Sequence, residues 1–250
     1  MAGEFDGKVA LVTGASRGLG AAAARALAAE GAHVILIART VGALEEIDDL
    51  IQADGGSATL VPYDLLETAG IDGLAAPLLE RWGRLDMLIG NAGMLGQVSP
   101  LSQVEPATWD KTFALNVTAN WRLIRALDPL LRRAPAGRAV FITSGITRNL
   151  PAYWGPYSAS KAALEAMVVS YARELEQTAV RVNLLNPGPT RTALRAQAYP
   201  GEDATKLPGP EHIARSLLPL LRPDFEGNGL WIAGDTLVPD GAVPDGQTRH

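Results

Sequence analysis

The chain has no cysteine among its 250 residues, which excludes disulfides, thiolate nucleophiles and cysteine metal ligands. It has three histidines, His33, His212 and His250, and they lie too far apart in sequence to indicate a histidine-rich metal site. Basic residues are also scarce, because 22 Lys and Arg stand against 27 Asp and Glu and leave a formal net charge of −5. Proteins that bind nucleic acids carry basic patches, so we expect no nucleic-acid partner.

Long apolar runs are missing as well. The longest uncharged segment, Met87–Val104, is interrupted by Asn, Gln, Ser and Pro, and the first eight residues lack the features of a signal peptide. We therefore expect no membrane span and a cytoplasmic location. Hydrophobic residues at 47% and charged residues at 20% are typical of a globular protein, and the length suffices for one sizeable core.

What the chain does have is an alternation of short apolar runs with helix-length amphipathic stretches. The runs that predict strands are Lys8–Val12, His33–Ala38, Ser57–Val61, Asp86–Ile89, Arg138–Thr143, Val180–Leu185 and Gly229–Ala233. The stretches that predict helices are Gly18–Glu30, Val41–Ala53, Ala69–Trp82, Pro106–Arg133, Tyr157–Thr178 and Glu211–Leu221, with a Pro/Gly-rich connection over Pro187–Pro210. This pattern predicts a single doubly wound α/β domain of the Rossmann type over residues 1–250, with a seven-stranded parallel sheet and helices on both faces.

A glycine-rich loop, residues 13–20 (TGASRGLG), follows the first predicted strand. Gly14 permits a tight turn, Gly18 lets the backbone approach a pyrophosphate, and Gly20 allows the helix to pack closely on the strand. The start of the helix then offers free N–H groups and a positive dipole end to an anion. A glycine-rich turn without a ligand is the alternative, but the place of the loop after the first strand favours a dinucleotide site.

The end of the second predicted strand bears on the choice of cofactor. An acidic residue there binds the ribose 2′-hydroxyl of NAD, whereas an arginine accommodates the 2′-phosphate of NADP. Here Ala38 is followed by Arg39, the first carboxylate comes at Glu45, and Arg17 of the glycine loop can reach the same place. The sequence therefore favours NADP(H) over NAD(H), although Arg39 alone could be a solvated strand end.

A candidate acid–base group follows the fifth predicted strand. Tyr157 and Lys161 are four residues apart and share one helix face, and Ser144 stands at the carboxyl end of a central strand, where open α/β sheets bind ligands. A free tyrosine has a pKa near 10, and a lysine ammonium on the same face would lower it. An amphipathic surface helix is the alternative, because this spacing by itself is a weak pattern.

Taken together, these motifs resemble the short-chain dehydrogenase/reductase family over residues 8–233. The resemblance rests on Thr13-Gly14-x-x-x-Gly18-x-Gly20, Asp64, Asn91-Ala92-Gly93, Asn116, Ser144, Tyr157-x-x-x-Lys161 and Asn186-Pro187-Gly188, all in order. Within the family the chain is most similar to the YciK-type bacterial oxidoreductases, on Trp154-Gly155-x-Tyr157, Asn186-Pro187-Gly188-x-Thr190-Arg191-Thr192 and Gly201-Glu202-Asp203 with Lys206-Leu207.

The resemblance implies a role for each matching residue. Tyr157 would be the general acid, Ser144 would bind the substrate oxygen, Lys161 would hold the nicotinamide ribose and depress the tyrosine pKa, and Asn116 would position a water that links Lys161 to solvent. The other implied cofactor contacts are Gly14, Ser16, Arg17, Gly18, Leu19, Gly20, Arg39, Asp64 at the adenine amino group, Leu65, Asn91, Ala92 and Gly93 beside the adenine ribose, and Pro187, Gly188, Thr190 and Thr192 at the carboxamide. No metal is implied.

The substrate is expected to be a small carbonyl or alcohol compound, with specificity in the loops Met94–Val98, Gly145–Trp154 and residues 190–210. These loops carry Arg148, Arg191 and Arg195. They could bind an anionic tail, but solvated arginines or bridges to Glu202 and Asp203 are the favoured interpretation.

The chain departs from the family at its end. Many members have Val-Asp-Gly-Gly after the last strand, and here the residues are Ile232-Ala233-Gly234-Asp235-Thr236. The resemblance therefore does not define the C-terminal wall of the pocket or the contacts between subunits, although it still defines the chemistry. The resemblance implies a homodimer or homotetramer formed through helices Pro106–Arg133 and Tyr157–Thr178, and we expect the tail 234–250 to lie near a partner chain. A catalytically silent protein that binds or senses NADP(H) is the rival function.

Overall fold

The structure is a computed structural model that describes residues 3–234. These residues form one sheet of seven parallel strands in the order β3-β2-β1-β4-β5-β6-β7. The strands are β1 Val9–Thr13, β2 His33–Ala38, β3 Ser57–Pro62, β4 Met87–Gly90, β5 Arg138–Ile142, β6 Arg181–Asn186 and β7 Trp231–Ala233. The chain winds outward from β1 to β3 and then returns to β4 beside β1, so the strand order reverses between β1 and β4. Such a reversal leaves a crevice at the carboxyl ends of the strands.

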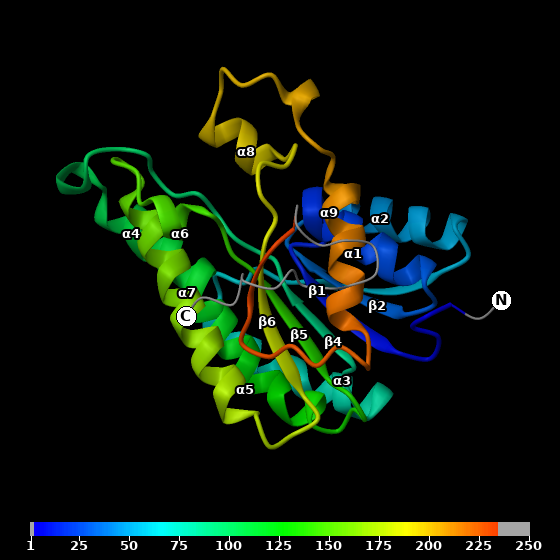
Figure 1. Ribbon diagram of the computed structural model, residues 1–250. Coiled ribbons are helices and arrows are strands. Elements are labelled where there is room, and N and C mark those ends of the chain that lie inside the picture. The colour runs from blue at the N-terminus through cyan, green and yellow to red at the C-terminus, as the bar shows by residue number, and fades with distance from the viewer. Residues whose placement is uncertain (1–2, 235–250) are drawn as a thin grey trace.

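Helices cover both faces of the sheet (Figure 1). The α-helices are α1 Gly18–Ala29, α2 Val41–Ala53, α3 Ala75–Trp82, α4 Pro106–Phe113, α5 Ala119–Leu131, α6 Ile146–Asn149, α7 Gly155–Glu174, α8 Ala193–Ala198 and α9 Pro210–Leu217. Shorter 3₁₀ segments are η1 Thr68–Leu74, η2 Leu101–Gln103, η4 Ala204–Lys206 and η5 Leu218–Leu221, and η3 Ala114–Thr118 is a π-helical turn. The predicted doubly wound fold with helices on both faces is confirmed.

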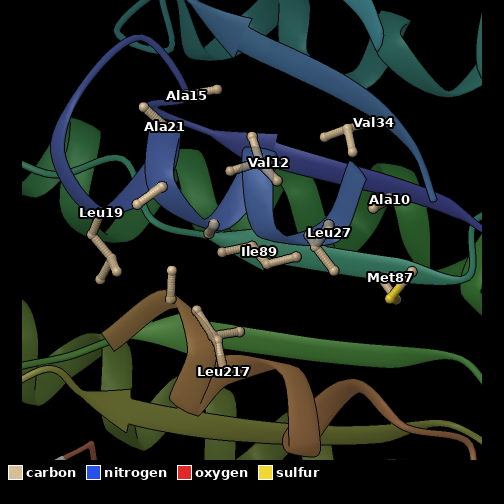
Figure 2. Packing of buried hydrophobic residues seen from close by; sticks show 14 of the residues in the cluster. Ala10, Val12, Ala15, Leu19, Ala21, Leu27, Val34, Met87, Ile89 and Leu217 are labelled. Atoms are coloured by element: carbon tan, nitrogen blue, oxygen red, sulfur yellow. The ribbon is translucent and has the colours of Figure 1, made fainter. Parts of the chain in front are cut away.

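The core consists of two apolar clusters, one on each face of the sheet. In the first, α1, α2 and α9 pack on the strands, and Figure 2 shows Leu27 of α1, Ile89 of β4 and Leu217 of α9 among its members. In the second, α3, α5 and α7 pack on the opposite face. Central strands such as β1 and β4 are buried throughout, because helices cover both of their faces. This double burial holds the carboxyl ends of the strands as a fixed platform.

The predicted helix Pro106–Arg133 is not continuous, because the π turn η3 separates α4 from α5. The predicted helix Ala69–Trp82 begins as the 3₁₀ segment η1, which contains two glycines, and the last predicted helix becomes 3₁₀ at Pro219, which cannot donate a backbone hydrogen bond. The connection predicted over Pro187–Pro210 holds α8 and η4, and Figure 1 shows α8 projecting beyond the main body. The bounds of β2 are those predicted, and the bounds of the other strands differ from the prediction by at most two residues.

Some expectations concern features outside the sheet. In the part of the chain that the structure describes, no helix combines the length and the apolar character needed to cross a bilayer. Over the same part, no three His, Asp or Glu side chains are grouped in a way that could hold a metal ion. The predicted tail beyond Gly234 lies outside the described residues, so its contact with a partner chain stays a prediction.

Candidate active site

A cavity of about 1230 Å³ lies at the carboxyl ends of the strands. Its walls come from the glycine loop after β1, the ends of β2 and β4, the segment after β5, the start of α7, and the chain from β6 through α8. Of the predicted site residues, the cavity is lined by Gly14, Ser16, Arg17, Gly18, Leu19, Arg39, Asp64, Leu65, Asn91, Ala92, Gly93, Ser144, Tyr157, Lys161, Pro187, Gly188, Thr190 and Thr192. Two predicted residues, Gly20 and Asn116, lie behind this wall. The structure therefore brings segments from most of the chain together around one space.

The glycine loop has the backbone that its sequence predicts. Gly14 and Gly18 both adopt positive φ, at 64° and 56°, a region that only glycine enters at little cost. A Cβ atom on Gly20 would overlap the carbonyl oxygen of Gly14, so this glycine serves the close packing of α1 on the loop rather than a ligand. The N-terminus of α1 then faces the cavity at Gly18 and Leu19, as an anion site requires.

The end of β4 is tied to the glycine loop through Thr13. Its Oγ1 atom accepts hydrogen bonds from the backbone N–H groups of Asn91 at 2.9 Å and Ala92 at 3.0 Å. The Asn91 side-chain amide donates back to the carbonyl of Thr13 at 2.9 Å. These bonds hold the two loops at the point where the strand order reverses. Thr13 belongs to the glycine-loop motif, but no pattern in the sequence indicated that its hydroxyl would link two strands.

Cations border the cavity at the end of β2. Arg17 and Arg39 line it, and Arg39 is 65% exposed with its Nη1 atom 4.0 Å from Oδ2 of Asp64. An exposed ion pair at that distance contributes little to stability, so the Arg39 guanidinium remains available to bind an anion. No carboxylate stands at Ala38, where an NAD-type site would place one. The glycine cradle and these two arginines fit the phosphates of NADP(H).

The acid–base candidates meet at the opposite end of the cavity. Tyr157 and Ser144 both line the cavity, and the Ser144 side chain is near enough to the Tyr157 hydroxyl to lower its pKa. The Lys161 ammonium donates to the carbonyl oxygen of Ile142 at 2.8 Å and lies 5.9 Å from the centroid of the Tyr157 ring. Tyr157 and Lys161 retain only 7% and 4% of their exposure. The predicted trio therefore lies at one end of the cavity, with Tyr157 and Lys161 buried and Ser144 partly exposed.

The pKa values at this end correct one expectation. Burial raises the pKa of Tyr157 to about 12, and its hydrogen bond with Ser144 opposes that rise. Burial also lowers the pKa of Lys161 to about 8, against the charge of Glu165, which raises it. The pKa of Tyr157 is therefore raised overall, whereas the sequence predicted that Lys161 would lower it. The physical reason is that withdrawal from water disfavours the phenolate more strongly than its neighbours favour it.

Asn116 lies in the π turn and is fully buried. Its side-chain amide clasps the backbone of Met94: Oδ1 accepts from the N–H at 2.9 Å and Nδ2 donates to the carbonyl at 2.9 Å. Nδ2 also donates to Ser160 Oγ at 2.9 Å. A Cβ atom on Gly93 would lie 3.5 Å from Lys161 Nζ, so this clasp fixes the segment that packs beside the lysine. The water relay stays a prediction, and in the structure Asn116 holds the backbone of Met94 in place.

The segment after β6 is fastened to the segment after β5 by Asn186. Its Oδ1 atom accepts from the N–H groups of Gly145 at 2.9 Å and Gly188 at 3.1 Å. Farther along, the hydroxyl of Thr192 accepts from the N–H of Arg195 at 3.2 Å and so caps α8. The two loops that flank Ser144 are therefore held by one amide oxygen, a role that the sequence did not reveal for Asn186.

Aromatic side chains line the substrate side of the cavity. The rings of Trp154 and Tyr199 lie 5.4 Å apart. Arg195 lies 3.8 Å from the Tyr199 ring centroid and forms a two-bond ion pair with Glu202 at 2.6 Å. The favoured interpretation of a bridge to Glu202 is thus confirmed for Arg195, whereas Arg148 pairs with Glu165 at 3.0 Å instead. Arg191 is exposed at the cavity wall.

Comparison with known proteins places the chain in a family. The model of the short chain dehydrogenase family matches residues 8–203. The chain is 40% identical over 234 residues to the uncharacterized oxidoreductase YciK of Escherichia coli K12, covering 92% of this chain and 88% of that one. A short chain dehydrogenase structure from Pseudomonas syringae is 41% identical with a TM-score of 0.89, over 94% of this chain and 97% of that one. Another, from Escherichia coli CFT073 complexed with NADPH, is 37% identical with a TM-score of 0.88, over 94% and 99%. The chain therefore belongs to the short chain dehydrogenase family of oxidoreductases and is similar to its YciK-type members.

Proposed function

We propose that the chain is an NADP(H)-dependent oxidoreductase that interconverts a carbonyl compound and the corresponding secondary alcohol. The observation that carries this proposal is that Ser144, Tyr157 and Lys161 line one end of a cavity whose other end is lined by the glycine loop. A proton donor and a dinucleotide cradle facing one space is what such a reaction needs.

For carbonyl reduction, NADPH supplies the hydride when it is bound. Tyr157 donates its proton to the carbonyl oxygen, and its raised pKa keeps it protonated at neutral pH. Ser144 donates a hydrogen bond to the same oxygen and stabilises the negative charge that develops there. The Lys161 ammonium, fixed on the carbonyl of Ile142, holds positive charge beneath the tyrosine and favours the phenolate that proton transfer leaves behind.

Cofactor preference rests on the cations at the end of β2. Arg17 and Arg39 would pair with the 2′-phosphate of NADP(H), and the neighbour from Escherichia coli CFT073 that holds NADPH supports this assignment. The remaining contacts are proposed for residues that line the same cavity: Ser16, Gly18 and Leu19 at the pyrophosphate, Asp64 and Leu65 at the adenine, Asn91, Ala92 and Gly93 at the adenine ribose, and Pro187, Gly188, Thr190 and Thr192 at the carboxamide.

An assembly of two or four copies through α4, α5 and α7 is part of the proposal. Large apolar side chains are exposed on or beside these helices, among them Leu101 and Leu150, each 64% exposed, and Trp121 of α5, 44% exposed. Apolar surface of this kind is typical of contacts between subunits. Light scattering at micromolar concentration tests the assembly, and a monomer would contradict it.

The rival function is a protein that binds NADP(H) without turnover. The contact between Tyr157 and Ser144 favours the enzyme, because a sensor has no need of a buried proton donor. Two measurements separate the two functions: the binding of NADPH and NADH, followed by NADPH consumption with a panel of aldehydes and ketones. Tight NADPH binding with consumption supports the enzyme, whereas binding without consumption of NADPH by any carbonyl supports the rival.

A further inference from the structure

Glu165 is a buried carboxylate on α7, one helical turn beyond Lys161, and no motif of the chain accounts for it. Its side chain is 11% exposed. Carboxylates are rarely buried to this degree unless they are paired, because removal of the charge from water is costly. The contacts that offset this cost indicate what the residue does.

Donors from three other elements converge on this carboxylate. Oε1 accepts from Thr143 Oγ1 at 2.6 Å, from Thr147 Oγ1 at 2.8 Å and from the Trp231 indole N–H at 2.9 Å. Oε2 accepts from Arg148 Nη1 at 3.0 Å, and the guanidinium of Arg148 lies 4.7 Å from the Trp231 ring centroid. Glu165 therefore joins the end of β5, the short helix α6 and strand β7 to α7.

The two threonines bracket Ser144. Thr143 precedes it directly, and Thr147 follows it by three residues, with its hydroxyl also 3.0 Å from the Ser144 carbonyl oxygen. Because one carboxylate oxygen holds both hydroxyls, the backbone that carries Ser144 is fixed to the same helix that carries Tyr157. Apolar residues can replace a buried ion pair with no loss of stability, so stability alone does not require a carboxylate here.

We propose that Glu165 is a positioning residue, which sets the distance between the Ser144 hydroxyl and Tyr157 by holding Thr143 and Thr147, and which couples β7 to this geometry through Trp231. The inference rests on the proposed function, in which Ser144 and Tyr157 act on one carbonyl oxygen. A misplacement of about 1 Å at such a site can cost on the order of a hundredfold in rate.

The charge of Glu165 has a second effect, on Lys161. The charged groups that face Glu165 are Arg148 from α6 and Lys161 from α7 itself, whereas β5 and β7 contribute the neutral Thr143 and Trp231. The carboxylate raises the pKa of Lys161 against the larger lowering by burial. Loss of this charge should move the deprotonation of Lys161 to lower pH.

The main test compares Glu165→Gln with Glu174→Gln, which makes the same change at an exposed position of the same helix. We expect Glu165→Gln to lower kcat by about 10- to 100-fold, to leave the Kd for NADPH unchanged, and to shift the alkaline limb of the pH profile to lower pH. Glu174→Gln should change none of these. If Glu165→Gln lowers only the Tm and keeps the kcat and alkaline limb of the control, the inference is overturned.

A second pair of variants decides the matter if Glu165→Gln does not fold. Thr147→Val removes the hydroxyl at nearly constant shape, and Thr147→Ser keeps it. A reduced kcat in the valine variant with recovery in the serine variant supports the inference, and equal kcat values overturn it. A wild-type protein that binds NADPH and reduces no carbonyl would overturn the proposed function and this inference together, whereas an active wild type with unaffected variants overturns the inference alone.

Discussion

The two ends of the cavity handle charge in opposite ways. At the cofactor end, formed by the glycine loop, Arg39 and Asp64, the backbone supplies the shape and the charged side chains stand in solvent. At the catalytic end, formed by Ser144, Tyr157, Lys161 and Glu165, the titratable groups are buried and held by side-chain hydrogen bonds. Changes at the first end should therefore alter affinity and little else, whereas changes at the second should alter rate, pH dependence and stability at once.

The largest effect is expected from Tyr157→Phe, which separates the two ends most sharply. It removes the proposed proton donor and keeps the ring, so kcat should fall by about 10²–10⁴. The Kd for NADPH should stay unchanged, because the cofactor cradle lies at the other end. Single-turnover kinetics and equilibrium binding measure the two quantities. A variant with nearly normal kcat would remove Tyr157 from the role of general acid.

The next effect concerns Arg39→Ala at the cofactor end. Charge-assisted hydrogen bonds to a phosphate contribute about 1.5–3 kcal/mol, so the variant should lose roughly 10- to 100-fold of its preference for NADPH over NADH. The Tm should not change, since Arg39 is exposed and makes only a long contact to Asp64. Titration with both cofactors gives the ratio, and Arg25→Ala, which alters an exposed arginine of α1, serves as the control. An unchanged ratio would contradict the NADP(H) assignment.

The pH dependence of the free energy of unfolding should show that Lys161 is buried. The pKa of Lys161 lies near 8 in the fold and near 10.5 when the chain is unfolded. Between these values the unfolded state binds more protons, so the contribution of Lys161 to the free energy of unfolding rises with pH through this window and is smaller below it. Urea unfolding from pH 7 to 10 should therefore show that the free energy of unfolding of the wild type rises relative to that of Lys161→Met. Over the same range, kcat/KM of the wild type should fall as the ammonium is lost. Parallel curves would show that the lysine is not buried in solution.

The smallest effect is expected from Glu202→Gln, which weakens the pair that holds Arg195 against Tyr199. Both partners are partly exposed, so the pair should contribute little to substrate binding, and KM should change by less than about tenfold. The value of kcat should not change, because neither side chain reaches Ser144 or Tyr157. A large loss of kcat would mean that the catalytic end extends into α8.

The sequence was sufficient to predict the strands, and to predict that Ser144, Tyr157 and Lys161 lie together, because apolar runs and helical spacing are local patterns. It was insufficient for the contacts of Asn116, a residue that the resemblance had named, and for Glu165 altogether, because their partners come from segments distant in sequence. The direction of the Tyr157 pKa was wrong for a related reason. Spacing reveals that a lysine is near, whereas the extent of burial depends on the whole fold.

The π turn at Ala114–Thr118 has a consequence for how the length of this chain can vary. A π turn holds one residue more than the same stretch of α-helix, so deletion of a single residue there would leave an unbroken helix. The buried Leu123 and Leu127 would then keep nearly their present places on the sheet, whereas deletion of a residue within α5 itself would turn every later residue by about 100° around the helix axis. The π turn is therefore the place where this helix pair can lose one residue and keep the packing of α5, at the cost of the widened turn that carries Asn116 to Met94.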